Sequence, residues 1–339
     1  MNQANTENRP VVSITVSPRT DGDRQLLQQA LSDLSREDSS IRMSPGSDGQ
    51  FIISAVGESH LELARKRILH ENGVEADVGR PTVVYLETIR KQAEADGEFI
   101  YRYGTQKRFY SKVKLRLEPL EEGSGYQFID EITEGAVPPE FVESVKAGIQ
   151  DAVNAGILVG QELVDLRAVL YDGSYHREDS NQSAFKIAAL MAFKEAVRKA
   201  NPVVLEPIMS VEIRGPEQHL SISTIIGDLK CRRGCIVGLE HYGDSFLVRA
   251  IVPMAEILGY GAYLRSNMQG LAKCSMRLIR YAEALPGDSG GDEASVPAIE
   301  PNDPNPDSGR DEAGVVAFRP KGPNSNSRSA AAKLDTESE

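Results

Sequence analysis

The sequence predicts an α+β protein in which two small modules of the same kind flank a different central domain. At each end of the globular part, strand and helix patterns follow one another as βαββαβ, the ferredoxin-like order. The region between them has long alternating segments and two helical patterns. Beyond Ala284 glycine, proline, serine, asparagine and aspartate dominate, a composition that cannot bury enough apolar surface to fold. The expected division is a disordered leader 1–9, a module 10–80, a central domain 81–203, a module 204–284 and a disordered acidic tail 285–339.

The first module is expected to contain two strands, a hairpin and two helices, because alternating segments are separated by segments with apolar residues at helical spacing. In Asp21–Leu34 these apolar residues are Leu26, Leu27, Ala30, Leu31 and Leu34. The expected order is a strand Val11–Val16, a helix Asp21–Leu34, a hairpin of Ile41–Met43 and Phe51–Ile53, a helix Glu58–His70 and a strand Val74–Val78.

The central domain begins with an extended segment, Pro81–Ala95, and continues as a β-rich region. Pro138 near the start of a helical pattern and Gly156 just beyond its end are typical helix boundaries. Asn201-Pro202 ends the second helix, because the residue before a proline disfavours helical geometry. The expected elements are strands at Glu98–Tyr103, Tyr110–Leu117, Tyr126–Ile129 and Leu163–Leu170, and helices at Pro138–Ala155 and from Ala184 onward.

The last module repeats the order of the first without visible sequence repetition. The apolar residues Ile222, Ile225, Ile226 and Leu229 share one helical face, and Gly243 lies at the turn of a predicted hairpin. The expected elements are a strand Leu205–Ile213, a helix Ser221–Lys230, a hairpin of Cys235–Leu239 and Phe246–Val252, a helix at the start of Met254–Leu264 and a strand Leu271–Tyr281.

The 339 residues carry a formal net charge of −12, which by itself argues against nucleic acid as a partner. From Pro286 to Glu339, however, there are eleven acidic and five basic residues, so half of the net charge lies in the tail. Apolar runs are too short to span a bilayer, the first residues are polar, and three cysteines cannot form a disulfide framework. We therefore expect a protein of the reducing cytoplasm without a membrane partner.

The segment Tyr101–Arg116 contains six basic residues and no acidic residue, with aromatic residues between them. Basic groups neutralise phosphates and aromatic rings stack on unpaired bases, so the segment is a candidate RNA-contacting surface. An edge strand whose cations prevent aggregation would have the same composition, and the sequence leaves both explanations open. The candidate RNA-binding residues here are Tyr101, Arg102, Lys107, Arg108, Phe109, Tyr110 and Lys112.

A second polar segment, Tyr171–Lys186, is expected to form a loop between a strand and a helix, with Asp179-Ser180-Asn181 capping the helix. A loop held out in this way commonly contacts a partner, and its candidate residues are Tyr175, His176 and Arg177. No cysteine, second histidine or nucleophile motif accompanies His176, so no catalytic residue, metal ligand or cofactor-binding residue is predicted.

Arg232 and Arg233 follow a predicted helix, where cations suit the helix dipole and also suit a phosphate. Cys231 and Cys235 do not have metal-ligand spacing. Glu58, His60 and Glu62 at a helix start are the one feature that would support an enzyme, although acids are ordinary in a first helical turn. There is no Gly-x-x-x-x-Gly-Lys-Ser/Thr phosphate loop.

Several motifs resemble the C-terminal half of bacterial elongation factor G, its domains III, IV and V, in the family's order from about Pro10 to Ala284. They are Gly57-Glu-Ser-His-Leu-Glu62, Val78-Gly-Arg-Pro-Thr-Val-Val-Tyr-Leu-Glu-Thr88, Tyr171-Asp-Gly-Ser-Tyr-His176, Ala184-Phe-Lys-Ile-Ala188, Ile226-Gly-Asp-Leu229, Arg232-Arg-Gly234, Gly259-Tyr260, Leu264-Arg-Ser266 and Gln269-Gly270. The resemblance implies ferredoxin-like outer domains and a central domain like domain 2 of ribosomal protein S5.

The resemblance also implies a role on the ribosome. The family's domain IV is an elongated arm whose two-loop tip enters the decoding side of the A site, where tRNA and mRNA lie. His176 corresponds to one loop and the basic aromatic segment to the other. Domain V of the family lies near RNA of the large subunit, which would give Arg232 and Arg233 an RNA partner.

Two departures limit what the resemblance implies. Without the nucleotide domain and domain II, this chain is not expected to hydrolyse GTP on its own. It is expected to be either a piece of a split factor, whose separate chain would bind GTP and magnesium, or a truncated paralogue that has lost these domains. The family's first tip loop is rich in glycine, whereas Tyr103–Val113 has bulkier and more basic residues. The chain is therefore expected either to support or modulate tRNA–mRNA translocation, or to occupy, protect or regulate the ribosome or another RNA without translocation.

Overall fold

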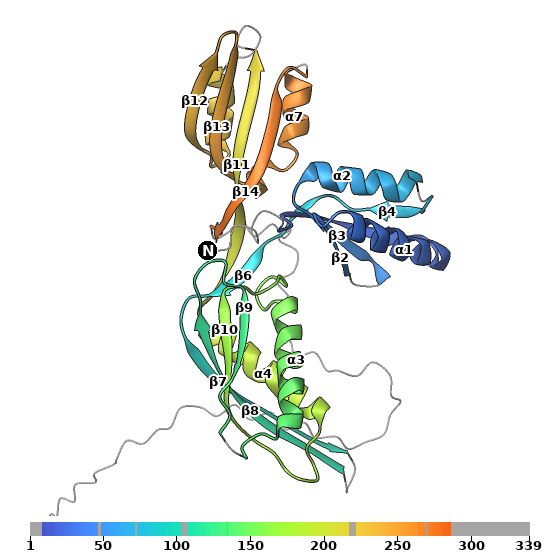
Figure 1. The fold of residues 1–339 in the computed structure, drawn as a ribbon, viewed down its shortest axis with the longest axis vertical. Coiled ribbons are helices and arrows are strands. Elements are labelled where there is room, and N and C mark those ends of the chain that lie inside the picture. Colours follow the sequence, from blue (N-terminus) through green and yellow to red (C-terminus); the bar gives the residue numbers. More distant parts are fainter. Residues whose placement is uncertain are drawn as a thin grey trace, which may run out of the picture.

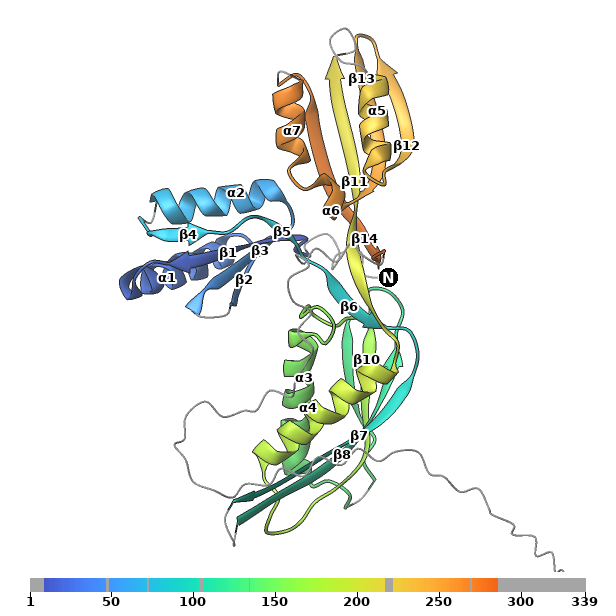
Figure 2. The same ribbon diagram turned by 180° about the vertical axis from the view of Figure 1, so that it is seen from behind.

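The computed structural model of the chain describes residues 9–46, 49–71, 73–103, 107–133, 135–216, 222–268 and 270–285. The expected leader 1–9 and tail 285–339 lie outside these ranges except for Arg9 and Leu285. The described residues form three parts in an elongated arrangement, with the central domain at one end and the C-terminal module at the other (Figures 1 and 2). None of the helices in the described part is both long and apolar enough to cross a bilayer.

The N-terminal module has the predicted βαββαβ order and an antiparallel sheet in the order β2-β3-β1-β4. Alternation in β1 places Ile14 and Val16 in the core, where Leu27 and Leu31 of α1 pack. Thr20 caps α1 by accepting a hydrogen bond from the Asp23 amide. The elements are β1 (Val12–Pro18), α1 (Asp21–Glu37), β2 (Ile41–Pro45), β3 (Phe51–Ala55), α2 (Glu58–Lys66), a π-helical turn (Arg67–Glu71), β4 (Ala76–Val78) and β5 (Thr82–Val83), which also pairs with β1.

The C-terminal module has the same topology, with the antiparallel order β12-β13-β11-β14. The helix expected at the start of Met254–Leu264 is two helices, because Gly259 adopts φ +78° and interrupts the hydrogen-bond ladder. The elements are β11 (Pro202–Pro216), α5 (Ile222–Cys231), β12 (Cys235–Tyr242), β13 (Ser245–Pro253), α6 (Met254–Ile257), α7 (Tyr260–Asn267) and β14 (Lys273–Glu283).

The central domain is a four-stranded sheet in the order β7-β8-β10-β9, with α3 and α4 packed against each other. β9 and β10 are parallel, and α3 connects them as a crossover helix. The elements are β7 (Ala93–Tyr103), β8 (Lys107–Pro119), β9 (Tyr126–Asp130), α3 (Pro139–Ala155), β10 (Leu166–Ser174) and α4 (Gln182–Lys199).

Small residues let α4 approach its neighbours closely. Ala188 and Ala192 on its buried face lie against Gly97 of β7, where an added Cβ would be 2.0 Å from the Ala188 carbonyl oxygen. At Gly148 of α3, an added Cβ would be 2.5 Å from the Lys186 carbonyl oxygen. The approach at Gly97 fixes the β7–β8 ribbon on α4, and this ribbon carries one of the two predicted tip loops.

Several strands are longer than expected, because pairing decides their ends. β10 continues to Ser174 by pairing with Lys112 of β8, so Tyr171–Ser174 is strand where a polar loop was expected. β7 begins at Ala93, where the sequence predicted only an extended, polar segment, because Ala93 pairs with Leu117. Polar alternation near the end of a strand does not distinguish paired backbone from loop.

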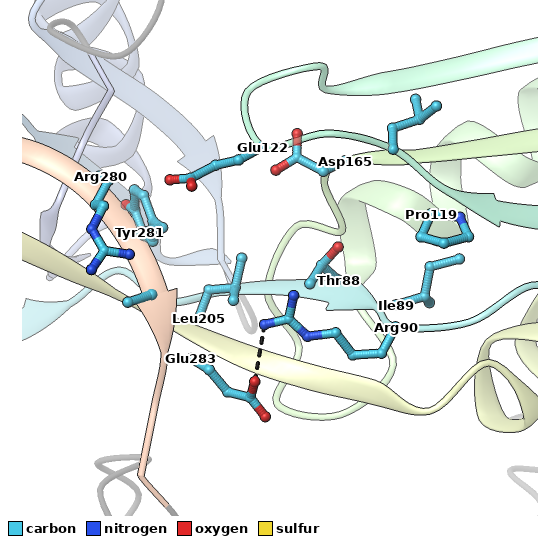
Figure 3. Close-up of a pocket in the computed structure, with 12 residues that line it drawn as sticks. Thr88, Ile89, Arg90, Pro119, Glu122, Asp165, Leu205, Arg280, Tyr281 and Glu283 are labelled. Atoms are coloured by element: carbon cyan, nitrogen blue, oxygen red, sulfur yellow. Dashed lines mark hydrogen bonds and ion pairs between the residues drawn. The ribbon is translucent and has the colours of Figure 1, made fainter.

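A short strand, β6 (Leu86–Ile89), lies where the three parts meet. It pairs with the first residues of β11, from Pro202 opposite Ile89 to Leu205 opposite Leu86. β11 then continues into the sheet of the C-terminal module, so residues 203 and 204, at the expected boundary, lie within one strand. Beside this joint is a pocket of about 300 Å³, next to the ion pair of Arg90 with Glu283 at 3.0 Å (Figure 3).

Glu87 of β6 is completely buried, and its carboxylate accepts hydrogen bonds from four backbone amides of the loop after α3. The donors are Ile157 at 2.7 Å, Leu158 at 2.9 Å, Val159 at 2.8 Å and Gln161 at 3.2 Å. The backbone of Glu87 also bonds to Glu162 and Val164 on the way into β10. One side chain therefore ties the end of α3 to the strand that connects the modules.

The outer modules also contact each other directly. The Glu58 carboxylate of α2 accepts a hydrogen bond from the Gly259 amide at the start of α7. The Tyr281 hydroxyl of β14 donates to the carbonyl oxygens of Pro10 at 3.1 Å and Val84 at 3.4 Å. Glu58, which the sequence placed in a possible acid–base cluster, thus serves as a contact between modules.

Replacing Glu87 by Gln should lower the free energy of unfolding by about 2–3 kcal/mol. The side-chain amide has no negative charge, and its NH2 group would face backbone N–H groups that need an acceptor. Hydrogen exchange of the Ile157, Leu158 and Val159 amides should become faster. Glu143→Gln on the exposed face of α3 is the matched control and should leave both quantities unchanged. Unchanged exchange in Glu87→Gln would contradict the assigned role.

Candidate nucleic-acid interface

The two predicted tip loops lie together at the end of the central domain farthest from the C-terminal module (Figures 1 and 2). One is the outer part of the β7–β8 ribbon, and the other is the connection from β10 to α4. We call these two segments the tip: Tyr101–Tyr103 with Lys107–Lys112, and Ser174–Asn181.

Tyr110 of β8 joins the two segments. Its backbone N–H donates to the Asp179 carbonyl oxygen at 2.9 Å, and its own carbonyl oxygen accepts from the Ser180 hydroxyl at 2.7 Å. The Tyr110 and Ser174 hydroxyls are 2.6 Å apart. The outer edge of β8 is thus occupied by the β10–α4 connection, which satisfies backbone groups that an edge strand would expose.

The histidine of the tip belongs to a tight turn. The His176 amide donates to the Ser180 hydroxyl at 2.9 Å, and the Ser180 amide donates to the His176 carbonyl oxygen at 3.0 Å. Nδ1 of His176 lies 3.3 Å from an Asp179 carboxylate oxygen, while 58% of its side chain remains exposed. Asn181 caps α4 by accepting from the Ala184 amide at 2.8 Å. The turn presents the imidazole to solvent on a fixed backbone.

A row of aromatic rings follows one face of the β7–β8 ribbon. Phe99 and Tyr101 stack with ring centroids 6.4 Å apart, and Tyr101 and Phe109 stack at 6.1 Å. Phe99 packs against the core of the central domain, whereas Tyr101 is 39% exposed. The row therefore extends from the core to an exposed ring at the outer part of the ribbon, where a flat base can stack.

The basic stripe of β8 is partly neutralised within the protein. Lys112 lies 3.3 Å from Asp96, Lys114 lies 2.7 Å from Asp172, and Arg116 contacts Glu118 at 2.8 Å and Glu131 at 3.0 Å. The hydrogen bond between Lys114 and Asp172 raises the pKa of the lysine and lowers that of the aspartate. The inner half of the stripe is thus a row of cations paired with acids of the protein. Because β8 lies between β7 and β10 here, this half is not the edge strand that the sequence left open as an explanation.

The outer half of the stripe comprises Arg102, Lys107 and Arg108, whose side chains lie outside the described part of the structure. Their backbones pair across the ribbon, Arg102 opposite Arg108 and Tyr103 opposite Lys107. On the other segment Tyr175 is 44% exposed, and Arg177 is exposed without an ion pair to any described residue. The sequence-predicted residues of the central domain therefore all come from two adjoining segments.

The two predicted arginines of the C-terminal module are far from the tip and already have partners. Arg232 binds Asp228 at 3.2 Å and the Glu256 carbonyl oxygen at 2.8 Å, and its guanidinium lies over the rings of Tyr260 and Tyr263. These contacts fix the end of α5 against α6 and α7.

Arg233 adopts φ +58° and makes two hydrogen bonds to Glu206 of β11, at 2.6 and 3.3 Å. The Glu206 side chain is 1% exposed, and among the described residues the Arg233 guanidinium compensates its charge inside the module. From its position at the end of a helix, Arg233 was expected to bind a phosphate or to interact with the helix dipole. The sequence around it gives no sign of its actual partner, a buried carboxylate on a distant strand.

The role of Ser180 was not predicted, because the sequence pattern around it indicated only a helix cap. The sequence could not indicate this role, because the Ser180 hydroxyl binds the backbone of Tyr110, which lies on a strand far away in the sequence. Within the described ranges, no group of three or more His, Cys, Asp or Glu side chains is gathered as a metal site requires.

Comparisons with known proteins agree with this organisation. Three family models match in succession: Elongation Factor G, domain III at residues 8–80, Elongation factor G, domain IV at 81–201, and Elongation factor G C-terminus at 203–288. A crystal structure of a Thermus thermophilus protein is similar, with 36% sequence identity and a TM-score of 0.60. The match covers 82% of this chain and 41% of that one, so this chain spans less than half of the similar protein.

Replacing Ser180 by Ala removes both hydrogen bonds of its hydroxyl and should release the turn from β8. We expect faster hydrogen exchange at the amides of His176 and Tyr110, equivalent to about 1–2 kcal/mol of local stability. Ser183→Ala, at an exposed position in the first turn of α4, is the control. Equal exchange in the two variants would argue against a joined tip.

Replacing Arg233 by Ala should destabilise the C-terminal module by about 3 kcal/mol, because Glu206 would keep a buried, unpaired charge. Thermal unfolding measures the loss. Adding Glu206→Gln should restore part of it, since the neutral amide needs no cation. If the double variant is no more stable than Arg233→Ala, the ion pair does not have this role.

Proposed function

We propose that this protein binds the ribosome and supports or modulates tRNA–mRNA translocation. The proposal starts from the family: the chain belongs to the elongation factor G family and carries its domains III, IV and V. In this proposal the tip faces the decoding side of the A site. The protein would then act in the cytoplasm, where its ribosomal partners are.

The observation that carries the proposal is the joined tip at the far end of an elongated domain. Two segments from different parts of the sequence are held together through Tyr110, and both present polar or aromatic groups to solvent. A rigid arm whose exposed polar and aromatic groups lie at its narrow end can enter a narrow, RNA-lined site. Such an arm is less suited to form a broad protein–protein interface.

The chemistry of the tip also suits RNA. Tyr101 offers an exposed ring for base stacking, and Arg177 offers a cation that no described residue neutralises. The side chains of Arg102, Lys107 and Arg108 would add positive charge on the adjoining ribbon. Lys112, His176 and Tyr175 belong to the same proposed surface, whereas Arg232 and Arg233 would contribute to RNA binding mainly by shaping their module.

In this proposal, GTP binding and hydrolysis belong to a nucleotide domain that is not among these residues. The sequence contains no phosphate loop, so GTP and magnesium would be bound by a nucleotide domain and domain II outside these residues. Those domains would supply hydrolysis, while the residues described here would supply the arm.

A second function is favoured by one sequence feature of the tip. The first loop has Thr105-Gln-Lys-Arg108 where the family is rich in glycine, and bulkier side chains limit how closely a backbone approaches RNA. In this alternative the protein occupies, protects or regulates the ribosome, or binds another RNA, without driving translocation.

Neutralising the tip should weaken ribosome binding. The variant Arg108→Gln/Arg177→Gln/Lys107→Gln removes three positive charges and should reduce co-sedimentation with ribosomes about tenfold or more at low salt, with a smaller dependence on salt. Binding by the unaltered chain should itself fall as salt increases.

The matched control is Lys146→Gln/Lys194→Gln/Arg198→Gln, which removes three charges from exposed positions on α3 and α4. It should sediment like the unaltered protein. Absence of co-sedimentation for the unaltered chain at both low and moderate salt would reject the proposed function. A translocation assay with added nucleotide domain and domain II separates the two candidate functions, since restored movement excludes the second.

A further inference from the structure

One face of the sheet in the C-terminal module is open. Alternation along β14 turns Cys274 and Met276 toward the core formed with α5 and α7, so Lys273, Ser275 and Arg277 lie on the opposite face. All three of these side chains are exposed. We call the face that they share with their cross-strand neighbours on β11, β12 and β13 the open face.

The open face has an excess of positive charge. Glu212 is neutralised by Arg214 at 3.1 Å and by Arg249 at 3.2 Å, and Arg249 also contacts Glu240. These groups balance one another. Lys273 and Arg277 on the neighbouring strand make no ion pair with any described residue, so two cations remain uncompensated beside this network.

The sequence that follows β14 has the complementary charge. Residues 286–312 contain eight acidic side chains and one basic side chain, Arg310. The acidic residues are Asp288, Asp292, Glu293, Glu300, Asp303, Asp307, Asp311 and Glu312.

The position of this segment favours contact with the open face. β14 has 11 residues and ends at Glu283, with only residues 284 and 285 between it and the segment. Since an extended chain covers about 3.3–3.6 Å per residue, residues 286–312 can run back along the whole strand. The covalent connection gives the segment an effective concentration on the order of millimolar at the face.

We propose that the acidic segment 286–312 docks on the open face of the C-terminal sheet through Lys273 and Arg277. The carboxylates of the segment then cover a surface that phosphates could otherwise bind. A polyanion such as RNA has to displace the segment before it can bind there. This competition rests on the proposed function, whereas the docking itself does not.

Docking can be tested on the full chain with a carbodiimide, which joins a lysine amine and a carboxylate directly as an amide. Mass spectrometry should find Lys273 linked to carboxylates of residues 286–312, with the yield falling at a salt concentration of about 0.5 M. Lys146 and Lys194, which are also exposed on α3 and α4, serve as internal controls and should give only background links to the segment.

A charge reversal sharpens this test. Arg277→Glu keeps the reacting amine of Lys273 and should lower its yield about threefold or more by like-charge repulsion, while Arg198→Glu on α4 should leave it unchanged. A Lys273 yield no higher than that of Lys146 and Lys194, or no effect of Arg277→Glu, would overturn the docking.

Competition is tested separately by co-sedimentation with ribosomes. Changing the eight acidic residues of the segment to their amides should strengthen binding about threefold or more at low salt. Equal binding of the two chains would overturn the competition. If neither chain binds ribosomes, the proposed function fails, and the cross-linking result still decides whether the segment docks.

Discussion

The buried carboxylate of Glu87 is the constraint on which the arrangement of the three parts depends. A charge without solvent is tolerated only with full hydrogen bonding, and four amides of the loop after α3 supply it. The same residue lies in β6, whose backbone pairs with β11 on one side and meets Leu163 on the other. The orientation of the central domain and the start of the C-terminal sheet are therefore set by one short strand.

The tip is positioned from this joint by close packing. Gly97 and the alanines of α4 leave no room for a Cβ between helix and ribbon, so the β7–β8 ribbon follows α4 outward. Cross-strand ion pairs such as Lys114–Asp172 then cover the inner part of β8. Among the described side chains, the cations of the inner part are therefore compensated by acids, whereas the outer part of the ribbon presents the exposed ring of Tyr101.

In the C-terminal module, the positions of basic residues in the sequence do not show which of them are free to bind a partner. Arg232 and Arg233 have the composition of a phosphate site, yet both guanidinium groups bind groups within the module. Lys273 and Arg277 stand out less in the sequence, since they alternate with apolar residues in an ordinary strand. They are nonetheless cations that have no ion pair with any described residue, on a face that no described helix of the module covers.

The sequence by itself determined the α+β class, both βαββαβ modules and the residues of the two tip segments, because alternation, helical spacing and capping are local properties. It could not determine that β10 reaches Ser174, that β6 exists, or that Ser180 binds the backbone of Tyr110, since these depend on partners far along the chain. Only the tertiary structure decided which cations are compensated, because an ion pair such as Arg233–Glu206 joins residues that no local pattern relates.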